Sequence, residues 1–401
     1  MLAPIIWLHS DDPFMPSDIS GHLLHTSPRL DFEPIQDRSG RDLNNLSSLN
    51  DYGADIFLTA DDDASISPNW ILGEVPDATG ALQNSTACAV VIVEHSDADV
   101  DAFYFYFYSF DEGGDIEQVV HPLEKLFPDT KPGDHYGNHV GDWEHNMVRF
   151  KAGKPTGIWF SQHAFGQACL WTDETCFSKD GARPVVYSAR GSHANYPFPG
   201  SHVHDDALID VADKGQIWDP IKPAYYYKYD PDRKTFAAAE PDITPTDWLY
   251  FNGQWGDKQY PDSDPRQKTI PYFGLKKFTN GPNGPQFKHL VRKGLMPDER
   301  PKDTVMKTAV RWYLSMYGCC LKDYNPWGVI ISIVLGLAVL IGLIVFAVRK
   351  LKPHVRGWIE RRRGWFVARK EHISRLEQED VQLGLLGREG IDEDGRYRYP
   401  E

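Results

Sequence analysis

The side chains best suited to chemistry lie between Gly133 and Phe150, where the sequence reads GDHYGNHVGDWEHNMVRF. Eleven positions hold five potential ligands: His135, His139, Asp142, Glu144 and His145. Residues 142–150 have the composition of a strand, and side chains two apart on a strand share a face, so Asp142 and Glu144 are expected to point the same way. His139 precedes them in a glycine-flanked loop and can turn back toward both carboxylates. The set His139, Asp142 and Glu144 predicts a site for one divalent cation.

The ligand types leave the identity of the ion open. Imidazole and carboxylate ligands with room for water suit Mg²⁺, Ca²⁺, Mn²⁺ or Zn²⁺, and an oxygen-rich set favours the harder ions. The same residues could serve general acid and base catalysis if a substrate cleft lies beside them. The alternative is a surface strand whose carboxylates are solvated or paired with Arg149.

A second acidic cluster follows the strongest strand signal in the chain. Residues 102–110 read AFYFYFYSF, and aromatic side chains fit a pleated, half-buried surface. This run ends at Asp111, which begins the sequence DEGGD. Asp111 is therefore expected to be either a fourth metal ligand or part of a solvated turn that the two glycines allow.

Two further strand patterns each lead to a histidine. Residues 157–163 read GIWFSQH, and residues 184–193 read PVVYSARGSH. Functional residues are often found where a strand ends in a loop. His163 and His193 are therefore predicted to contact the metal ligands or the bound ligand, and His145 is a further candidate. Other predicted strands cover residues 5–9, 55–59 and 89–94, and residues 248–260 are predicted to form an aromatic strand and a glycine turn. These patterns predict one mainly β domain with long loops over residues 1–305.

Residues 327–348 form an apolar segment of 22 residues without a charge. This length spans a bilayer as a helix. Nine Lys and Arg residues follow between Arg349 and Lys370, so the positive-inside rule places the C-terminal tail in the cytosol and the β domain in a lumen or outside the cell. The predicted organisation is the β domain (1–305), a juxtamembrane segment with a helical pattern (306–326), the membrane helix (327–348) and a basic, then acidic cytosolic tail (349–401).

Charge and short motifs agree with the placement of the β domain in a lumen or outside the cell. Residues 349–401 carry a net charge of about +3, so residues 1–348 carry about −18 and the whole chain −15. This negative charge argues against binding nucleic acid. Asn45 and Asn84 begin glycosylation sequons, and Cys169 with Cys176 could close a small loop in an oxidising compartment. The N-terminal run MLAPIIWLHSDDPF is a poor signal peptide. Either an upstream signal is missing, which we favour, or residues 327–348 themselves direct translocation of the preceding domain.

The tail offers two features for partners. Residues 355–378 mix aromatic and basic side chains and can lie on the anionic cytosolic face of a bilayer; the alternative is an ordinary positive-inside flank. Residues 377–401 are acidic and expected to be disordered. The cytosolic tail is thus the predicted contact for trafficking proteins.

Several long motifs resemble the vacuolar protein sorting-associated protein 62 family of fungi. They are WLHSDDPFMPSDI, VDAFYFYFYSF, GNHVGDWEHNMVRF, WFSQHAFGQA, RPVVYSARGSHANYP and WLYFNGQWGDKQYP, within residues 4–290. The resemblance implies a role in vacuolar protein sorting, including cytoplasm-to-vacuole targeting, without an established enzymatic reaction.

A second similarity, to the necrosis-inducing NPP1-like proteins, rests on NHVGDWEH beside their heptapeptide GHRHDWEH. This resemblance implies a β-sandwich-like ectodomain and a divalent cation held by Asp111, His139, Asp142 and Glu144. Here Gly141 replaces the second histidine and the insertion after Asp111 is longer, so Asp134 is an alternative upstream ligand. Those proteins bind sphingolipid head groups, which implies a glycan or lipid head group as a ligand.

Three functional hypotheses follow. The first is a single-pass membrane protein of vacuolar sorting with a cation site, and its variant is a metal-dependent binding module for glycans or lipid head groups. The second is a metal-dependent hydrolase with His163 or His193 as base, although the sequence contains no GxSxG nucleophile motif. The third is a receptor ectodomain in which the charged cluster is only structural.

Overall fold

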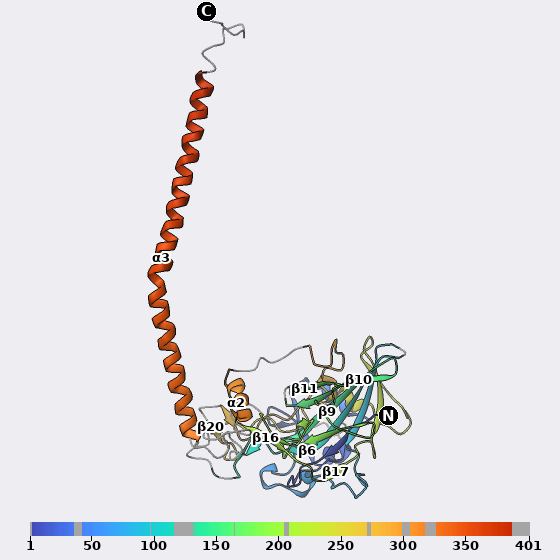
Figure 1. The fold of residues 1–401 in the computed structure, drawn as a ribbon. Helices are drawn as coiled ribbons and strands as arrows, with labels where there is room; N and C mark the ends of the chain where they lie inside the picture. Colours follow the sequence, from blue (N-terminus) through green and yellow to red (C-terminus); the bar gives the residue numbers. More distant parts are fainter. Residues whose placement is uncertain are drawn as a thin grey trace, which may run out of the picture. The chain divides into compact units, whose positions relative to one another are not determined.

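Two mixed β-sheets form the framework of the first part of the chain (Figure 1). The computed structural model describes residues 2–35, 42–96, 98–115, 131, 133–163, 165–203, 208–270, 274–298, 305–316 and 326–386. The larger sheet has seven strands in the order β11 (Phe165–Leu170), β10 (Lys154–Gln162), β9 (His139–Lys151), β6 (Val100–Asp111), β5 (Cys88–Glu94), β18 (Tyr225–Asp230) and β19 (Thr235–Ala238). The smaller one orders β12 (Lys179–Asp180), β13 (Arg183–Ser188), β1 (Ile5–Trp7) and β17 (Ile217–Trp218), with β14 (Asn195–Tyr196) also paired to β13. The prediction of a mainly β fold is confirmed.

Smaller elements surround these sheets. Short pairings join β2 (Thr26–Leu30) to β3 (Glu33–Pro34) and β4 (Ile56–Ala60), β7 (Gly114–Asp115) to β8 (His135–Tyr136), β15 (Gly200–Val203) to β16 (Ile209–Ala212), and β20 (Thr269–Ile270) to β21 (Leu275–Lys276). Among the described residues of this part, the helices are α1 (Ile19–Leu24), α2 (Val305–Met316) and the 3₁₀ turns η1 (Leu46–Tyr52), η2 (Ala64–Ile66), η3 (Asn69–Leu72), η6 (Asp247–Tyr250) and η7 (Pro285–Phe287). The helix α2 agrees with the helical pattern of the juxtamembrane sequence.

The aromatic strand β6 is buried on both faces. Its side chains alternate, so the phenylalanines of the run FYFYFY lie on one face and the tyrosines on the other. The Phe face packs against Trp143 of β9 and Trp159 of β10. The Tyr face packs against Ile6 and Trp218, which belong to the smaller sheet. Burial on both faces explains why the strand is one continuous aromatic run rather than alternating with polar residues.

The predicted strand over residues 248–260 is wrong. This segment begins in the 3₁₀ turn η6 and continues as a loop. Trp248 and Trp255 both pack on Trp143, with ring centroids 5.6 and 5.3 Å apart. The aromatic side chains of this segment therefore fill the core from a loop that covers the Phe face, and composition alone could not distinguish that role from a strand.

The helix α3 (Pro326–Leu386) belongs to a separate unit of the chain, residues 323–401. Within the described residues, its segment Ile330–Lys352 is long and apolar enough to cross a membrane, close to the predicted 327–348. The helix continues to Leu386, so the disorder predicted from residue 377 is wrong for its first ten residues, which are rich in good helix formers. Residues 387–401 lie outside the described part of the chain.

The cysteine prediction is confirmed in one respect. Cys169 and Cys176 form a disulfide that closes the loop after β11. Cys88 is a buried free thiol on the Tyr face. The remaining pair, Cys319 and Cys320, lies outside the described residues.

The central position of β6 predicts a large cost for truncating its core side chains. Phe105 is fully buried, and its ring stacks on Phe103 with centroids 5.8 Å apart. We expect Phe105→Ala to lower the free energy of unfolding of the β domain by about 3–5 kcal/mol, and Phe105→Leu by much less. Urea unfolding followed by tryptophan fluorescence measures both. A loss below about 1 kcal/mol for the alanine variant would contradict this placement.

Candidate metal centre

The pairing of β6 with β9 brings the site together. The two strands are antiparallel, with Asp111 opposite His139 and Tyr108 opposite Asp142. Directly opposed residues of an antiparallel pair lie on the same face and close to each other. Asp111 ends one strand and His139 begins the other, so these two side chains meet at one edge of the sheet.

The backbone conformation of Gly141 allows the side chains of His139 and Asp142 to lie close together on one face of β9. Residues three apart on a regular strand point to opposite faces, but Gly141 has a φ of 68° and interrupts the alternation. A Cβ atom at this position would collide with the carbonyl oxygen of Trp255. Glycine is therefore needed both for the backbone angle and for the close approach of the loop.

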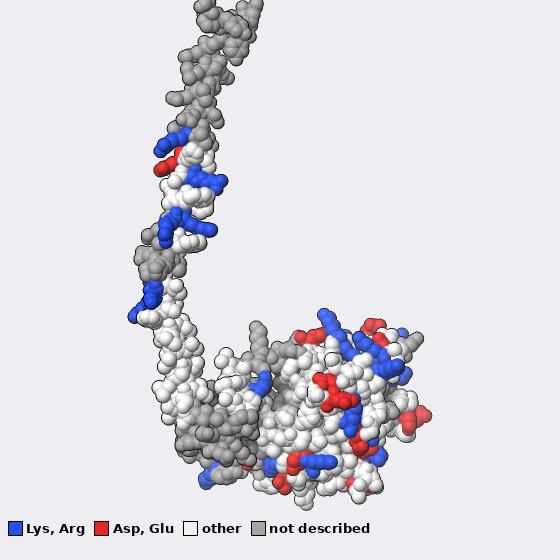
Figure 2. All heavy atoms as spheres, viewed as in Figure 1, with Lys and Arg blue, Asp and Glu red and all other residues white. Residues whose placement is uncertain are grey.

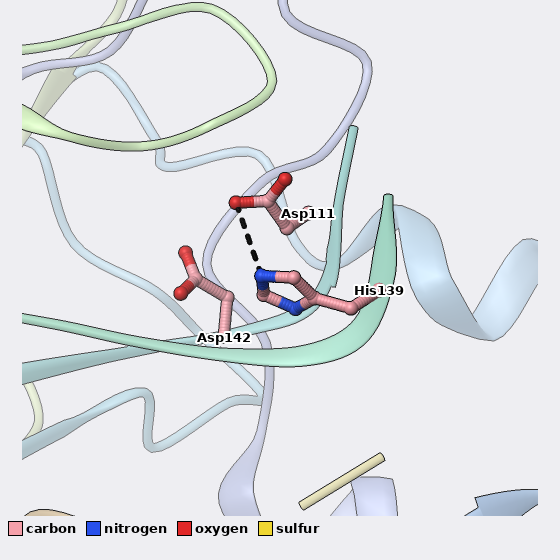
Figure 3. Close-up of side chains that lie close together, drawn as sticks. All are labelled: Asp111, His139 and Asp142. Carbon is pink, nitrogen blue, oxygen red and sulfur yellow. Dashed lines mark ion pairs between the residues drawn. The ribbon is translucent and has the colours of Figure 1, made fainter. Parts of the chain in front are cut away.

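Asp111, His139 and Asp142 converge (Figure 3). One potential ligand atom from each lies within 4.8 Å of the others, and His139 Nε2 is 3.5 Å from Asp111 Oδ2. The other ring nitrogen, Nδ1, lies 2.7 Å from the carbonyl oxygen of Gly141 and donates its proton there. This bond leaves the Nε2 lone pair directed at the two carboxylates, the tautomer that a metal-ligating histidine needs.

The donor set fits a divalent cation. Two ligands on a common ion at about 2.0–2.5 Å can be no more than about 5 Å apart, and the spacing of the three atoms meets that limit. Burial lowers the pKa of His139 despite the nearby Asp142, which favours the neutral, ligating imidazole. One nitrogen and two carboxylate donors suit Mg²⁺, Mn²⁺, Ca²⁺ or Zn²⁺, with water or further oxygen atoms completing the coordination.

The electrostatics around Asp111 also favour a cation. Burial, followed by repulsion from the Asp142 carboxylate, raises the pKa of Asp111 well above its usual range. The same two causes raise the pKa of Glu144 to about 8. Buried carboxylates that repel one another are stabilised when a positive ion lies between them.

Buried His193 forms a hydrogen bond to Asp142. Its Nδ1 lies 3.0 Å from Asp142 Oδ2, and its Nε2 lies 3.2 Å from the carbonyl oxygen of Phe14. Both partners are acceptors, so the ring donates twice and is protonated. Burial opposes that charge, but the bond to Asp142 and the nearby Asp12 outweigh burial and raise the pKa of His193. In turn the protonated ring lowers the pKa of Asp142, against its own burial, and keeps the carboxylate ionised.

Glu144 lies on the same face as Asp142 but outside the group of three. It is opposite Tyr106 in the register, and its carboxylate accepts a hydrogen bond from the hydroxyl of Ser161 on β10. The shared face agrees with the spacing argument. The assignment of Glu144 as a ligand stays a prediction, because its carboxylate is directed toward Ser161 rather than grouped with Asp111 and His139.

A cavity of about 360 Å³ opens beside the site. Its walls include Asp111 and His139 and, from other elements, His163 and Gln259. The ring of His163 is oriented by Asp210, whose Oδ2 lies 2.7 Å from Nε2. Asp210 is buried and also accepts hydrogen bonds from the hydroxyls of Ser192 and Tyr196. Two of the predicted site histidines, His139 and His163, therefore face one cavity.

A family model described as vacuolar protein sorting-associated protein 62 matches residues 1–273. The chain belongs to the Vps62 family. The vacuolar protein sorting-associated protein 62 of Saccharomyces cerevisiae is 32% identical over 356 residues, which cover 81% of this chain and 70% of that protein. TDA6 of the same yeast, also named for vacuolar protein sorting, is 33% identical over 326 residues, 73% of this chain and 66% of TDA6, just under two thirds of its length.

Solved structures similar to this Vps62-family chain are NPP1-like proteins. NLPPya in complex with glucosamine is 11% identical, with a TM-score of 0.24, and covers 56% of this chain and 70% of that one. A structure described as a toxin fold for microbial attack and plant defence has a TM-score of 0.25 at 10% identity. Scores this low carry neither fold detail nor ligand over to the Vps62-family chain.

The other predicted site residues lie elsewhere. His145 is on the Phe face, where its Nε2 accepts a hydrogen bond from Arg292 at 2.9 Å. Asp134 pairs with Lys268, so Asp111 is the upstream acid that meets His139. Arg149, expected in the alternative of a surface strand, instead forms a buried ion pair with Asp101. The two sequon residues, Asn45 and Asn84, are exposed, and their glycosylation stays a prediction.

Two residues of this Vps62-family site were missed. Asp12, in the segment SDDPF, accepts a hydrogen bond from the backbone N–H of Gly191 and lies 3.8 Å from His193. Asp210 orients His163. Asp210 lies outside every motif quoted above. Asp12 lies within WLHSDDPFMPSDI, the motif near the N-terminus that resembles the family, and that motif was the signal that could have pointed to it.

The close approach at Gly141 predicts a specific loss. Gly141→Ala is expected to lower the free energy of unfolding by more than about 2 kcal/mol and to displace His139 from Asp142, because both the angle and the space exclude a methyl group. Thermal unfolding with and without a divalent cation measures both effects: the variant should lose stability and any cation-induced rise in Tm.

Gly153 provides the matched control. It has a similar φ of 71°, but no atom lies within 4 Å of the Cβ that alanine would add. Gly153→Ala should therefore cost only the backbone strain, about 1 kcal/mol, and keep the cation response. Equal losses in the two variants would show that the contact with Trp255 is not what constrains the site.

Proposed function

We propose that this chain is a single-pass membrane protein of vacuolar protein sorting whose β domain holds a divalent cation at Asp111, His139 and Asp142. The convergence of these three ligand atoms within 4.8 Å carries the proposal for the cation. Membership of the Vps62 family supports the role in sorting. When bound, the cation would supply positive charge and open coordination positions for oxygen atoms of a ligand.

The proposed topology places the β domain in a lumen or outside the cell. The apolar segment Ile330–Lys352 of α3 supports a membrane anchor, and the basic residues after it support a cytosolic C-terminus. The disulfide between Cys169 and Cys176 supports an oxidising compartment for the β domain. We also infer that the β domain is a sandwich, since residues of both sheets pack together at the Tyr face.

The test is a sorting assay in a fungal strain whose own copy of this gene is deleted. Maturation of a vacuolar hydrolase reports sorting, and the wild-type chain should restore it. His139→Ala and Asp142→Asn should fail at equal protein levels, whereas Asp134→Asn should succeed because Asp134 pairs with Lys268 away from the three ligands. Full rescue by both site variants would show that sorting does not require the cation site.

A second candidate function is metal-dependent binding of a glycan or a lipid head group. The observation that favours it is the cavity of about 360 Å³ beside Asp111 and His139, whose walls include the polar side chains of Gln259 and Thr279. Polar walls around a cation suit a ligand rich in hydroxyl or phosphate oxygens. The cavity is of a size that accepts a small head group rather than a protein segment.

Titration calorimetry with a panel of monosaccharides and phosphorylated head groups tests this function. Binding should occur with added cation, disappear with a chelator, and weaken about tenfold in Gln259→Ala, which removes a wall of the cavity but none of the three ligands. Binding that persists in the presence of the chelator would show that the cavity binds its ligand without a cation.

For a hydrolytic role, the geometry distinguishes the two candidate bases. His193 is buried and donates from both ring nitrogens, so it has no position from which to accept a proton. His163 faces the cavity and is oriented by Asp210. A hydrolase would therefore use His163, and His163→Gln would abolish turnover but leave binding of the head group in place.

A further inference from the structure

Beyond the candidate membrane span, α3 carries an exposed apolar stripe. Trp358, Ile359, Trp365, Phe366 and Ile373 each leave between 46% and 60% of their surface exposed. Their spacings of seven residues, about two turns, place them along one side of the helix. We call these five residues the aromatic stripe. Large apolar side chains gathered on one side of a helix mark a surface that contacts something else.

Positive charge lies on and beside the aromatic stripe. The guanidinium of Arg362 is 4.6 Å from the ring centre of Trp358, and that of Arg369 is 5.2 Å from Trp365. Residues 355–375 contain seven Lys and Arg residues against two Glu, a net charge of +5. Glu371 follows Arg362 by nine residues, about two and a half turns, and so lies on the opposite side. Figure 2 shows Lys and Arg gathered along this part of α3, after an uncharged stretch.

The aromatic stripe begins just after the candidate span, which ends at Lys352. Pro353 follows directly. Proline has no backbone N–H, so one helical hydrogen bond is missing there, and a change of direction costs less at this point than elsewhere in α3. Residues after Pro353 would then run along the membrane surface rather than away from it.

We propose that residues 355–375 lie on the surface of an anionic bilayer, with the aromatic stripe among the head groups and the arginines paired with lipid phosphates or carboxylates. Tryptophan rings favour the boundary between the head groups and the acyl chains, and arginine side chains are attracted to anionic head groups. The inference rests on the membrane anchor proposed above. A second copy of this helix fits the aromatic stripe less well, because pairing two copies would bring Arg362 and Arg369 of both against each other.

The experiment uses the full-length chain in vesicles of phosphatidylcholine, alone or mixed with phosphatidylserine. Trypsin cleaves after the Lys and Arg residues between Arg356 and Arg375 in the fraction whose tail faces outward. Mass spectrometry follows the peptides that end at these residues and separates them from cleavage at Arg388, Arg396 and Arg398. We expect cleavage to be at least about tenfold slower on the mixed vesicles and to recover at high salt, which screens the charges.

Substitution of the aromatic stripe supplies the control. The triple variant Trp358→Gln/Trp365→Gln/Phe366→Gln should be cleaved equally fast on both vesicles. Val367→Gln should stay protected, since Val367 is equally exposed but follows Trp358 by nine residues and lies on the other side. Protection that persists in the triple variant would overturn the proposal, as would protection on neutral vesicles that disappears on dilution, which would indicate a second copy.

Flotation of the vesicles after an alkaline wash separates this inference from the proposed anchor. If the chain floats but its tail is cleaved equally on both vesicles, the aromatic stripe does not bind lipid and the anchor stands. If the chain does not float, the anchor itself fails, and the proposal for the tail fails with it.

Discussion

The antiparallel register between β6 and β9 is the constraint on which the rest of the β domain depends. It sets Asp111 opposite His139 and, further along, Tyr108 opposite Asp142. A slip of one residue would exchange the Phe and Tyr faces of β6, and both faces are packed against large side chains. The core and the candidate metal centre are therefore parts of one arrangement, because the aromatic packing that buries the sheet also aligns the ligands at its edge.

The buried carboxyl groups where β6 ends and β9 begins favour binding of a cation. Asp111, Asp142 and Glu144 are buried together, and protonated His193 contacts only one of them directly. Arg149 of the same strand forms its ion pair with Asp101, toward the far end of β9. Burial in a low-dielectric interior makes it costly to ionise all three carboxyl groups, and it raises the pKa of Asp111 and Glu144. A divalent cation at Asp111, His139 and Asp142 would offset that cost.

The sequence predicted what depends on local spacing. The aromatic strand, the shared face of Asp142 and Glu144, the pairing of Cys169 with Cys176 and the apolar helix all follow from patterns within a few residues. What it could not predict depends on contacts between distant segments. Asp210 meets His163 across 47 positions, and Trp248 fills the core from the 3₁₀ turn η6 rather than from a strand. The backbone of Trp255 leaves no room for a side chain at Gly141.

Metal content of the natively purified full-length chain tests the central claim most directly. Inductively coupled plasma mass spectrometry should find about one equivalent of a divalent cation in the wild type and in Asp134→Asn, and none in Asp111→Asn or Asp142→Asn. That result would establish the three residues as the site and identify the ion. A wild type without metal that also gains no stability from any of Mg²⁺, Ca²⁺, Mn²⁺ or Zn²⁺ would contradict the account and leave the buried acids as a structural network.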